Sequence, residues 1–217
     1  MAEEIFIAST ENLKDLKKQG KRICALVNRA IREKKDADLT SLTKVYALLY
    51  SAYVETSFLK LIHTPKAFTE SEIMQIMAEH NLEEKWVKCV NLAFNRLNIT
   101  NLGEVANKKQ TLNRLMQEYI IKPSLIRNKV AHGQWIYCLN SDCTKINQNT
   151  ITQIGNLDFV KIERYFCIFR DYYQIIAELK DYIESTKSWS LETKKHKILS
   201  SIKYQNYKEK YYKNGAY

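Results

Sequence analysis

The sequence predicts an all-α protein: a helical bundle with a small inserted β-hairpin and a basic C-terminal extension. Only five glycines and two prolines occur among 217 residues, well below average usage, which favours short loops. Apolar residues recur at intervals of three and four along most of the chain. No repeat or low-complexity linker separates domains, so we expect one bundle over residues 1–186 and an extension over residues 187–217.

The first two expected helices span residues 11–35 and 42–63. Leucine, isoleucine, valine and alanine form a stripe along one face of the first. The second is apolar on more than one face, which places it at the centre of the bundle. Thr40 or Ser41 is a candidate for its N-cap. Glu55 lies among its apolar residues and needs a partner, because an unpaired buried charge is costly.

Five further helices and the hairpin are expected downstream. Proline at position 123 suits a first helical turn and glycine at position 133 suits a C-terminal stop, so a helix of about ten residues is expected between them. Residues 134–156 are rich in aromatic, β-branched, Asn and Thr residues around the sequence SDCT, which favours a β-hairpin. The other helices are expected at residues 69–78, 82–97, 104–120 and 157–186.

The positive charge of the chain is concentrated near its C-terminus. The net charge is +10, and the last 31 residues contain eight lysines against two glutamates. Nucleic acid is a natural partner for such a field. A solubilising tail is the first alternative, and a dimer-packing helix with buried tyrosines is the second. If the segment binds RNA, the candidate contacts are Lys194, Lys195, Lys197, Lys203 and Tyr204.

The composition and the N-terminal sequence also predict the cellular location of the protein. No run of about 18 apolar residues predicts a membrane-spanning helix. The N-terminal sequence MAEEIFIAST carries acids where a secretory signal needs bases, so a cytoplasmic protein is expected. The five cysteines are scattered without the spacing of a zinc site, which predicts reduced thiols and neither a metal site nor a cofactor.

The stretch LIRNKVAHGQW, residues 125–135, carries the main functional signal. Asn128 and His132 lie four residues apart and therefore share a face of a helix. Arg127 is offset from Asn128 by about 100° and from His132 by about 140°, at 3.6 residues per turn. All three can border one pocket if a second surface closes over the end of the helix.

These residue types can cleave RNA without a metal. An imidazole, with an ordinary pKa of about 6.5, can take a proton from an RNA oxygen or give one to it at neutral pH. A guanidinium stays charged and can bind two phosphate oxygens, which stabilises a phosphorane. An amide can orient the imidazole or a phosphate oxygen. The ribose 2′-OH supplies the nucleophile.

The sequence RNKVAH resembles the ribonuclease motif of the HEPN superfamily of small helical bundles. The sequence AHGQW, followed by the expected hairpin and a long helix, resembles the bacterial stand-alone branch of that superfamily. Arg127 matches the family arginine, Asn128 the polar residue after it, and His132 the histidine. The resemblance implies a homodimer in which two such helix ends form a composite site. It also implies metal-independent cleavage that leaves a 2′,3′-cyclic phosphate, in a toxin–antitoxin or phage-defence setting with an antitoxin or other regulatory partner.

Each of these residues also has a structural interpretation. Arg127 could form an ion pair with Glu55, and His132 could interact with the last carbonyls of its helix. Lys129 and Gln134 could contact phosphate or only solvent. Trp135, just beyond, could stack on a base, or pack in the core or a dimer contact. The alternative function is accordingly a non-catalytic HEPN-like module that binds nucleic acid or protein.

Overall fold

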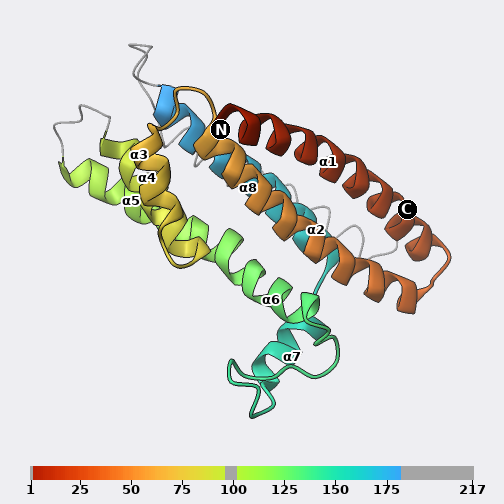
Figure 1. Cartoon of the computed structure of the whole chain (residues 1–217). Helices are drawn as coiled ribbons and strands as arrows, with labels where there is room; N and C mark the ends of the chain where they lie inside the picture. Colours follow the sequence, from red (N-terminus) through yellow and green to blue (C-terminus); the bar gives the residue numbers. More distant parts are fainter. Residues whose placement is uncertain (1, 96–101, 182–217) are drawn as a thin grey trace.

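The computed structural model describes residues 2–95 and 102–181, and their regular structure is helical (Figure 1). Within these ranges the chain forms no strand, only an isolated antiparallel bridge between Leu139 and Ile146. No described helix is long and apolar enough to cross a membrane. The helices are α1 (Ala2–Arg32), α2 (Asp36–His63), α3 (Glu70–Met77), α4 (Leu82–Asn95), α5 (Leu102–Met116), the π-helical turn η1 (Gln117–Ile121), α6 (Lys122–Ala131), α7 (Gln148–Gly155) and α8 (Phe159–Asp181).

Helix α2 lies at the centre of the bundle, as its apolar sequence predicts. It packs against α1 along its length and also contacts α8 and α6. Gly20 allows a close approach of α1, because a Cβ at this position would lie 3.3 Å from the Leu49 Cδ2 atom. Both helices begin earlier than predicted. Helix α2 starts at Asp36 after Lys35, so neither Thr40 nor Ser41 is its N-cap, and the Thr40 hydroxyl donates to the Asp36 carbonyl inside the helix.

Aromatic side chains from α2, α4 and α8 form the main core. Trp86 of α4 is fully buried, with ring contacts to Phe58 of α2 and to Phe169 and Tyr172 of α8. Loss of a buried ring of this size costs about 3–5 kcal/mol of folding free energy. This core therefore fixes the position of α2, and α2 in turn supports α6.

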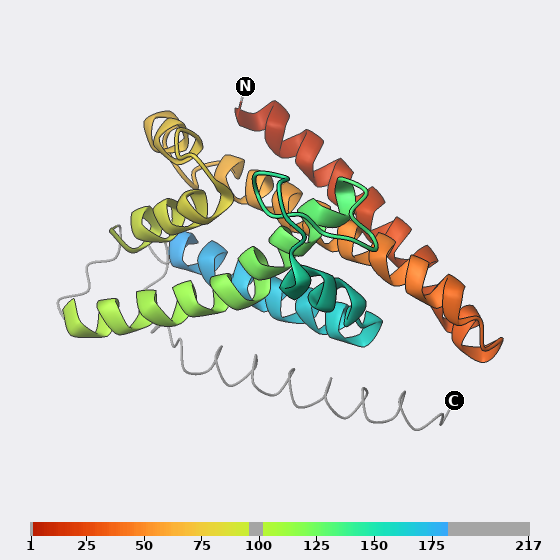
Figure 2. The same cartoon turned by 90° about the horizontal axis from the view of Figure 1, so that it is seen from below.

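Helices α5 and α6 form one continuous rod through the π-helical turn between them (Figure 2). The predicted break before Pro123 is wrong: the helix continues through this proline, although it has no N–H to donate to the Tyr119 carbonyl four residues earlier. The Tyr50 hydroxyl of α2 donates to the Tyr119 carbonyl oxygen inside the π-helical turn. The rod carries α6 away from α3 and α4 towards α7.

The predicted β-hairpin over residues 134–156 is wrong. Its first half is an irregular loop, and its second half is helix α7. The Asn147 side chain caps this helix by accepting a hydrogen bond from the Thr150 backbone N–H at 3.1 Å. Ile151 and Ile154 then contact a small cluster around Val130, so the apolar residues follow a helical spacing of three rather than a strand spacing of two.

Two sequence predictions lie partly or wholly outside the described residues. The extension over residues 187–217, with Lys194, Lys195, Lys197, Lys203 and Tyr204, is not among them. The last helix, predicted to reach residue 186, is described only to Asp181.

Candidate functional site

Helix α6 ends at the site in a Schellman motif. His132 is the C-cap residue, and its backbone N–H donates to the Asn128 carbonyl at 3.1 Å. Gly133 follows with a φ of +75°, its N–H donates to the Val130 carbonyl at 3.1 Å, and the Gln134 N–H donates to the Lys129 carbonyl at 2.9 Å. The predicted stop at Gly133 is confirmed, and the motif fixes the position of His132 at the helix end.

A hollow of about 700 Å³ lies between the end of α6, the loop after it, and α7. Asn128 and His132 line this hollow together and are both exposed, as their shared helix face predicts. Leu125 and Ile126 contribute its apolar part. The loop and α7 add residues that we did not predict as site residues, because the segment was expected to form a hairpin: Ser141, Cys143, Asn147, Thr150 and Gln153.

Arg127 lies outside this hollow and faces α2. Its guanidinium Nη2 forms an ion pair with the Glu55 carboxylate, as the structural interpretation of these residues predicted. The Arg127 side chain is 26% exposed and that of Glu55 is 43% exposed, so the pair is partly open to solvent. Burial lowers the pKa of Arg127 from its ordinary value, but a guanidinium remains charged. The Arg127 Nε–H is buried without a hydrogen-bond partner in the described part of the chain.

Lys129 and Gln134 hold the loop against α6. The Lys129 Nζ donates to the Leu139 carbonyl at 2.8 Å, and the Leu139 N–H donates to the Gln134 Oε1 at 2.9 Å. Both side chains also line the hollow. They are therefore not merely solvated, and their first role is to fix the wall that faces His132.

Trp135 packs within its own chain. Its indole N–H donates to the Val130 carbonyl at 2.8 Å, and the Lys44 ammonium lies 5.2 Å from the centroid of its ring. The ring contacts the small apolar cluster of Val130, Cys138 and Ile154. This agrees with the core interpretation of Trp135 and anchors the loop to α2.

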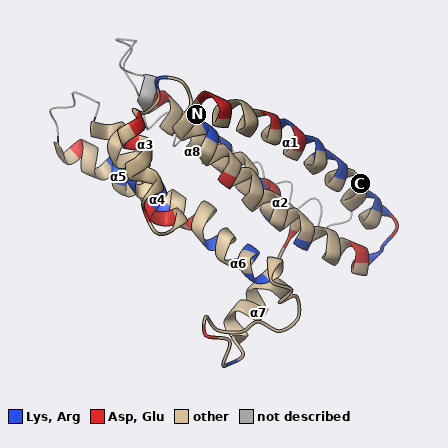
Figure 3. Cartoon of the chain, in the orientation of Figure 1, with Lys and Arg blue, Asp and Glu red and all other residues tan. Residues whose placement is uncertain are grey.

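Among the described residues that line the hollow, Lys129 is the one lysine, arginine, aspartate or glutamate. The segment that closes the hollow, residues 133–158, carries few charges (Figure 3). Among the described residues, no three His, Cys, Asp or Glu side chains gather as metal ligands would.

The chain was also compared with known proteins. No family model, curated protein or solved structure matches it. Any functional conclusion therefore depends on the motif and its geometry: Asn128 and His132 share a hollow with Lys129 and Gln134, whereas Arg127 and Glu55 form a separate pair on the α2 side of the same helix.

Proposed function

We propose that the protein is a metal-independent endoribonuclease of HEPN type that acts as a homodimer in the cytoplasm. The observation that carries this proposal is the exposed His132 side chain at the edge of a hollow that Asn128 and Lys129 also line. An imidazole, an amide and one ammonium in a single open hollow fit a phosphodiester next to a group that transfers protons.

In the proposed reaction, RNA provides its own nucleophile. The His132 imidazole takes the proton of a ribose 2′-OH, and the 2′-oxygen attacks the adjacent phosphorus. The bond from phosphorus to the 5′-oxygen then breaks, and that oxygen takes up a proton. The products are a 2′,3′-cyclic phosphate and a 5′-hydroxyl end. The Asn128 amide orients the phosphate, and the Arg127 guanidinium stabilises the charge on the phosphorane.

The separation of Arg127 and His132 within one chain is what supports a dimer in this proposal. Arg127 faces α2, so a site that uses both groups is completed by a second copy whose α6 end faces the first. Apolar side chains near the hollow are exposed and would be covered by such a contact: Leu125 is 60%, Ile136 73% and Tyr137 68% exposed. A toxin or phage-defence role, restrained by an antitoxin or regulatory partner, is the corresponding biological setting.

Cleavage of single-stranded RNA in excess EDTA tests this function. The full-length protein should produce fragments with cyclic phosphate and 5′-hydroxyl ends. His132→Ala should lower the rate by about 10² to 10⁴, because it removes one proton-transfer group. His80→Ala is the matched control, because His80 is exposed and lies away from the hollow, between α3 and α4. Strict dependence on added magnesium would contradict the mechanism, and unfolding of His132→Ala would indicate a structural histidine.

One observation favours the second candidate, a non-catalytic module that binds nucleic acid or protein. Arg127 is engaged by Glu55, and a binding module tolerates this separation of arginine and histidine. Such a module predicts RNA retention without cleavage, and equal binding by the wild type and His132→Ala. Analytical ultracentrifugation of the same samples then shows whether the protein is a dimer.

A further inference from the structure

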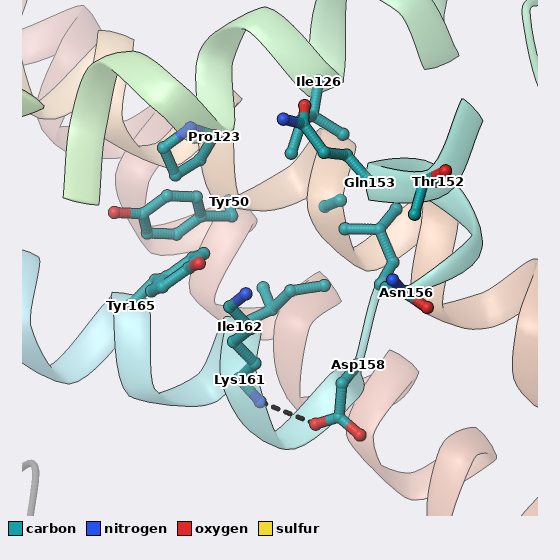
Figure 4. Close-up of a pocket in the computed structure, with 12 residues that line it drawn as sticks. Tyr50, Pro123, Ile126, Thr152, Gln153, Asn156, Asp158, Lys161, Ile162 and Tyr165 are labelled. Atoms are coloured by element: carbon teal, nitrogen blue, oxygen red, sulfur yellow. Dashed lines mark hydrogen bonds between the residues drawn. The ribbon is translucent and has the colours of Figure 1, made fainter. Parts of the chain in front are cut away.

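A second, smaller cavity lies directly beside the His132 hollow. Its volume is about 200 Å³, and α2, α6, α7 and α8 all contribute to its walls. Figure 4 shows Tyr50 and Tyr165 on one side of the cavity and the polar side chains of α7 on the opposite side. Ile126 and Gln153 line both this cavity and the hollow, so the two are adjacent across a single residue of α6 and a single residue of α7.

The walls of the cavity differ in chemistry. Pro123, Ile126, Ile162 and the two tyrosine rings form an apolar and aromatic part. The Tyr50 hydroxyl is already used, because it donates to the Tyr119 carbonyl, and Tyr50 is only 1% exposed. The half-buried Tyr165 therefore presents the accessible ring of this wall.

The opposite wall is polar, and two of its side chains are free to bind a ligand by hydrogen bonds. Gln153 and Asn156 are exposed, and within the described ranges neither carboxamide has a hydrogen-bond partner. Asp158, by contrast, caps α8 by accepting a hydrogen bond from the Lys161 backbone N–H at 2.9 Å (Figure 4). This side therefore offers carboxamides, which donate and accept hydrogen bonds at the same time, and the exposed Lys161 of α8 also lines the cavity.

We propose that this cavity receives one base of the RNA strand whose backbone passes His132, an inference that rests on the proposed ribonuclease function. An aromatic wall stacks on any base, and carboxamides can bond to its edge. The volume fits a single ring system, since pockets for drug-sized ligands measure about 300–1,000 Å³. The cavity would then select the nucleotide next to the scissile bond.

Filling the cavity tests the proposal. Ala47 of α2 lines the cavity, and Ala47→Leu places three further carbons there. Gly155→Leu is the matched control, because Gly155 does not line this cavity but a neighbouring one that shares Leu157 and Asp158 with it, and a Cβ at Gly155 meets nothing within 4 Å. Both substitutions are made together with His132→Ala, so that RNA is not consumed. Binding of oligouridylate and oligoadenylate to the full chain is then measured by fluorescence anisotropy.

We expect the His132→Ala protein to bind one oligonucleotide about tenfold more tightly than the other, because the carboxamides of Gln153 and Asn156 bond to the edge of the base, whereas stacking tolerates any base. Ala47→Leu should abolish this preference and Gly155→Leu should retain it. Gln153→Ala, on the exposed face of α7, should reduce the preference without disturbing the core, and it replaces Ala47→Leu if that variant does not fold. An unchanged preference in both Ala47→Leu and Gln153→Ala, or no preference at all, overturns the base site.

The failure of this inference and that of the ribonuclease proposal are distinguishable. Cleavage of both RNAs at equal rates, unaffected by Ala47→Leu, refutes the base site and leaves the ribonuclease standing. A cavity-dependent base preference without any cleavage in EDTA refutes the ribonuclease and leaves a base-binding site.

Discussion

The contribution of the ion pair between Arg127 and Glu55 to the stability of the protein can be predicted and measured. At an effective dielectric constant of about 20, two charges 4 Å apart attract by about 4 kcal/mol, and desolvation offsets much of this. Exposed pairs contribute about 0–1 kcal/mol, and breaking a buried pair costs about 3–5 kcal/mol. With side chains 26% and 43% exposed, this pair lies between those limits, nearer the exposed one. We expect a coupling free energy of about 1–2 kcal/mol.

The assay is a double-mutant cycle with Glu55→Gln, Arg127→Gln and the double variant, monitored by thermal and urea unfolding. A loss of this size lowers the melting temperature of a domain of 150–250 residues by about 2–8 °C. Glu33→Gln is the control, because it breaks exposed ion pairs with Arg29 and Lys35 and should change the melting temperature little. Strictly additive effects of the two substitutions at 55 and 127 would refute the reasoning.

The same variants distinguish a catalytic role of Arg127 from a structural role. Glu55→Gln leaves the guanidinium in place, so RNA cleavage should persist and could rise as Arg127 is released towards phosphate. Arg127→Gln removes the cation and should reduce cleavage by about 10² or more, the effect of losing one preorganised electrostatic group. Equal losses in both variants would show that Arg127 acts only by holding α6 against α2.

Three further outcomes are expected. Gly133→Ala should destabilise the protein by about 1 kcal/mol, because its φ is +75°, whereas Gly155→Ala should be neutral or slightly stabilising in urea unfolding. A thiol reagent should modify exposed Cys143 first and leave Cys89 unmodified in the native protein, because Cys89 is fully buried and burial raises its pKa. Burial raises the pKa of Tyr173 to about 12, above the unfolded value of about 10, so its stabilising contribution is complete below pH 10 and is lost as the pH rises from 10 to 12. Fluorescence-detected unfolding over that pH range checks this, and a constant stability would contradict it.

The helices were predictable because long stretches of the sequence keep a three-four apolar spacing. The π-helical turn and the start of α7 depend on individual contacts that this spacing does not contain. The Tyr50 hydroxyl reaches a carbonyl of the rod from another helix, and the Asn147 cap selects a helix where β-branched residues favour a strand. In both places a single polar side chain decides the local structure.

At the candidate site, too, the sequence predicts some features, and others depend on contacts between helices. Asn128 and His132 share a hollow because four residues bring side chains to one face, which the sequence predicts. Arg127 precedes Asn128 directly, and its offset of about 100° lets α2 bind it through Glu55. The Arg127 guanidinium and the His132 imidazole therefore lie on different sides of one helix, although they are close in sequence. Under the proposed mechanism, catalysis by both groups requires the end of a second α6 helix. Replacement of the exposed apolar residues Leu125 and Tyr137 by lysine should therefore abolish the proposed dimer and the proposed RNA cleavage together.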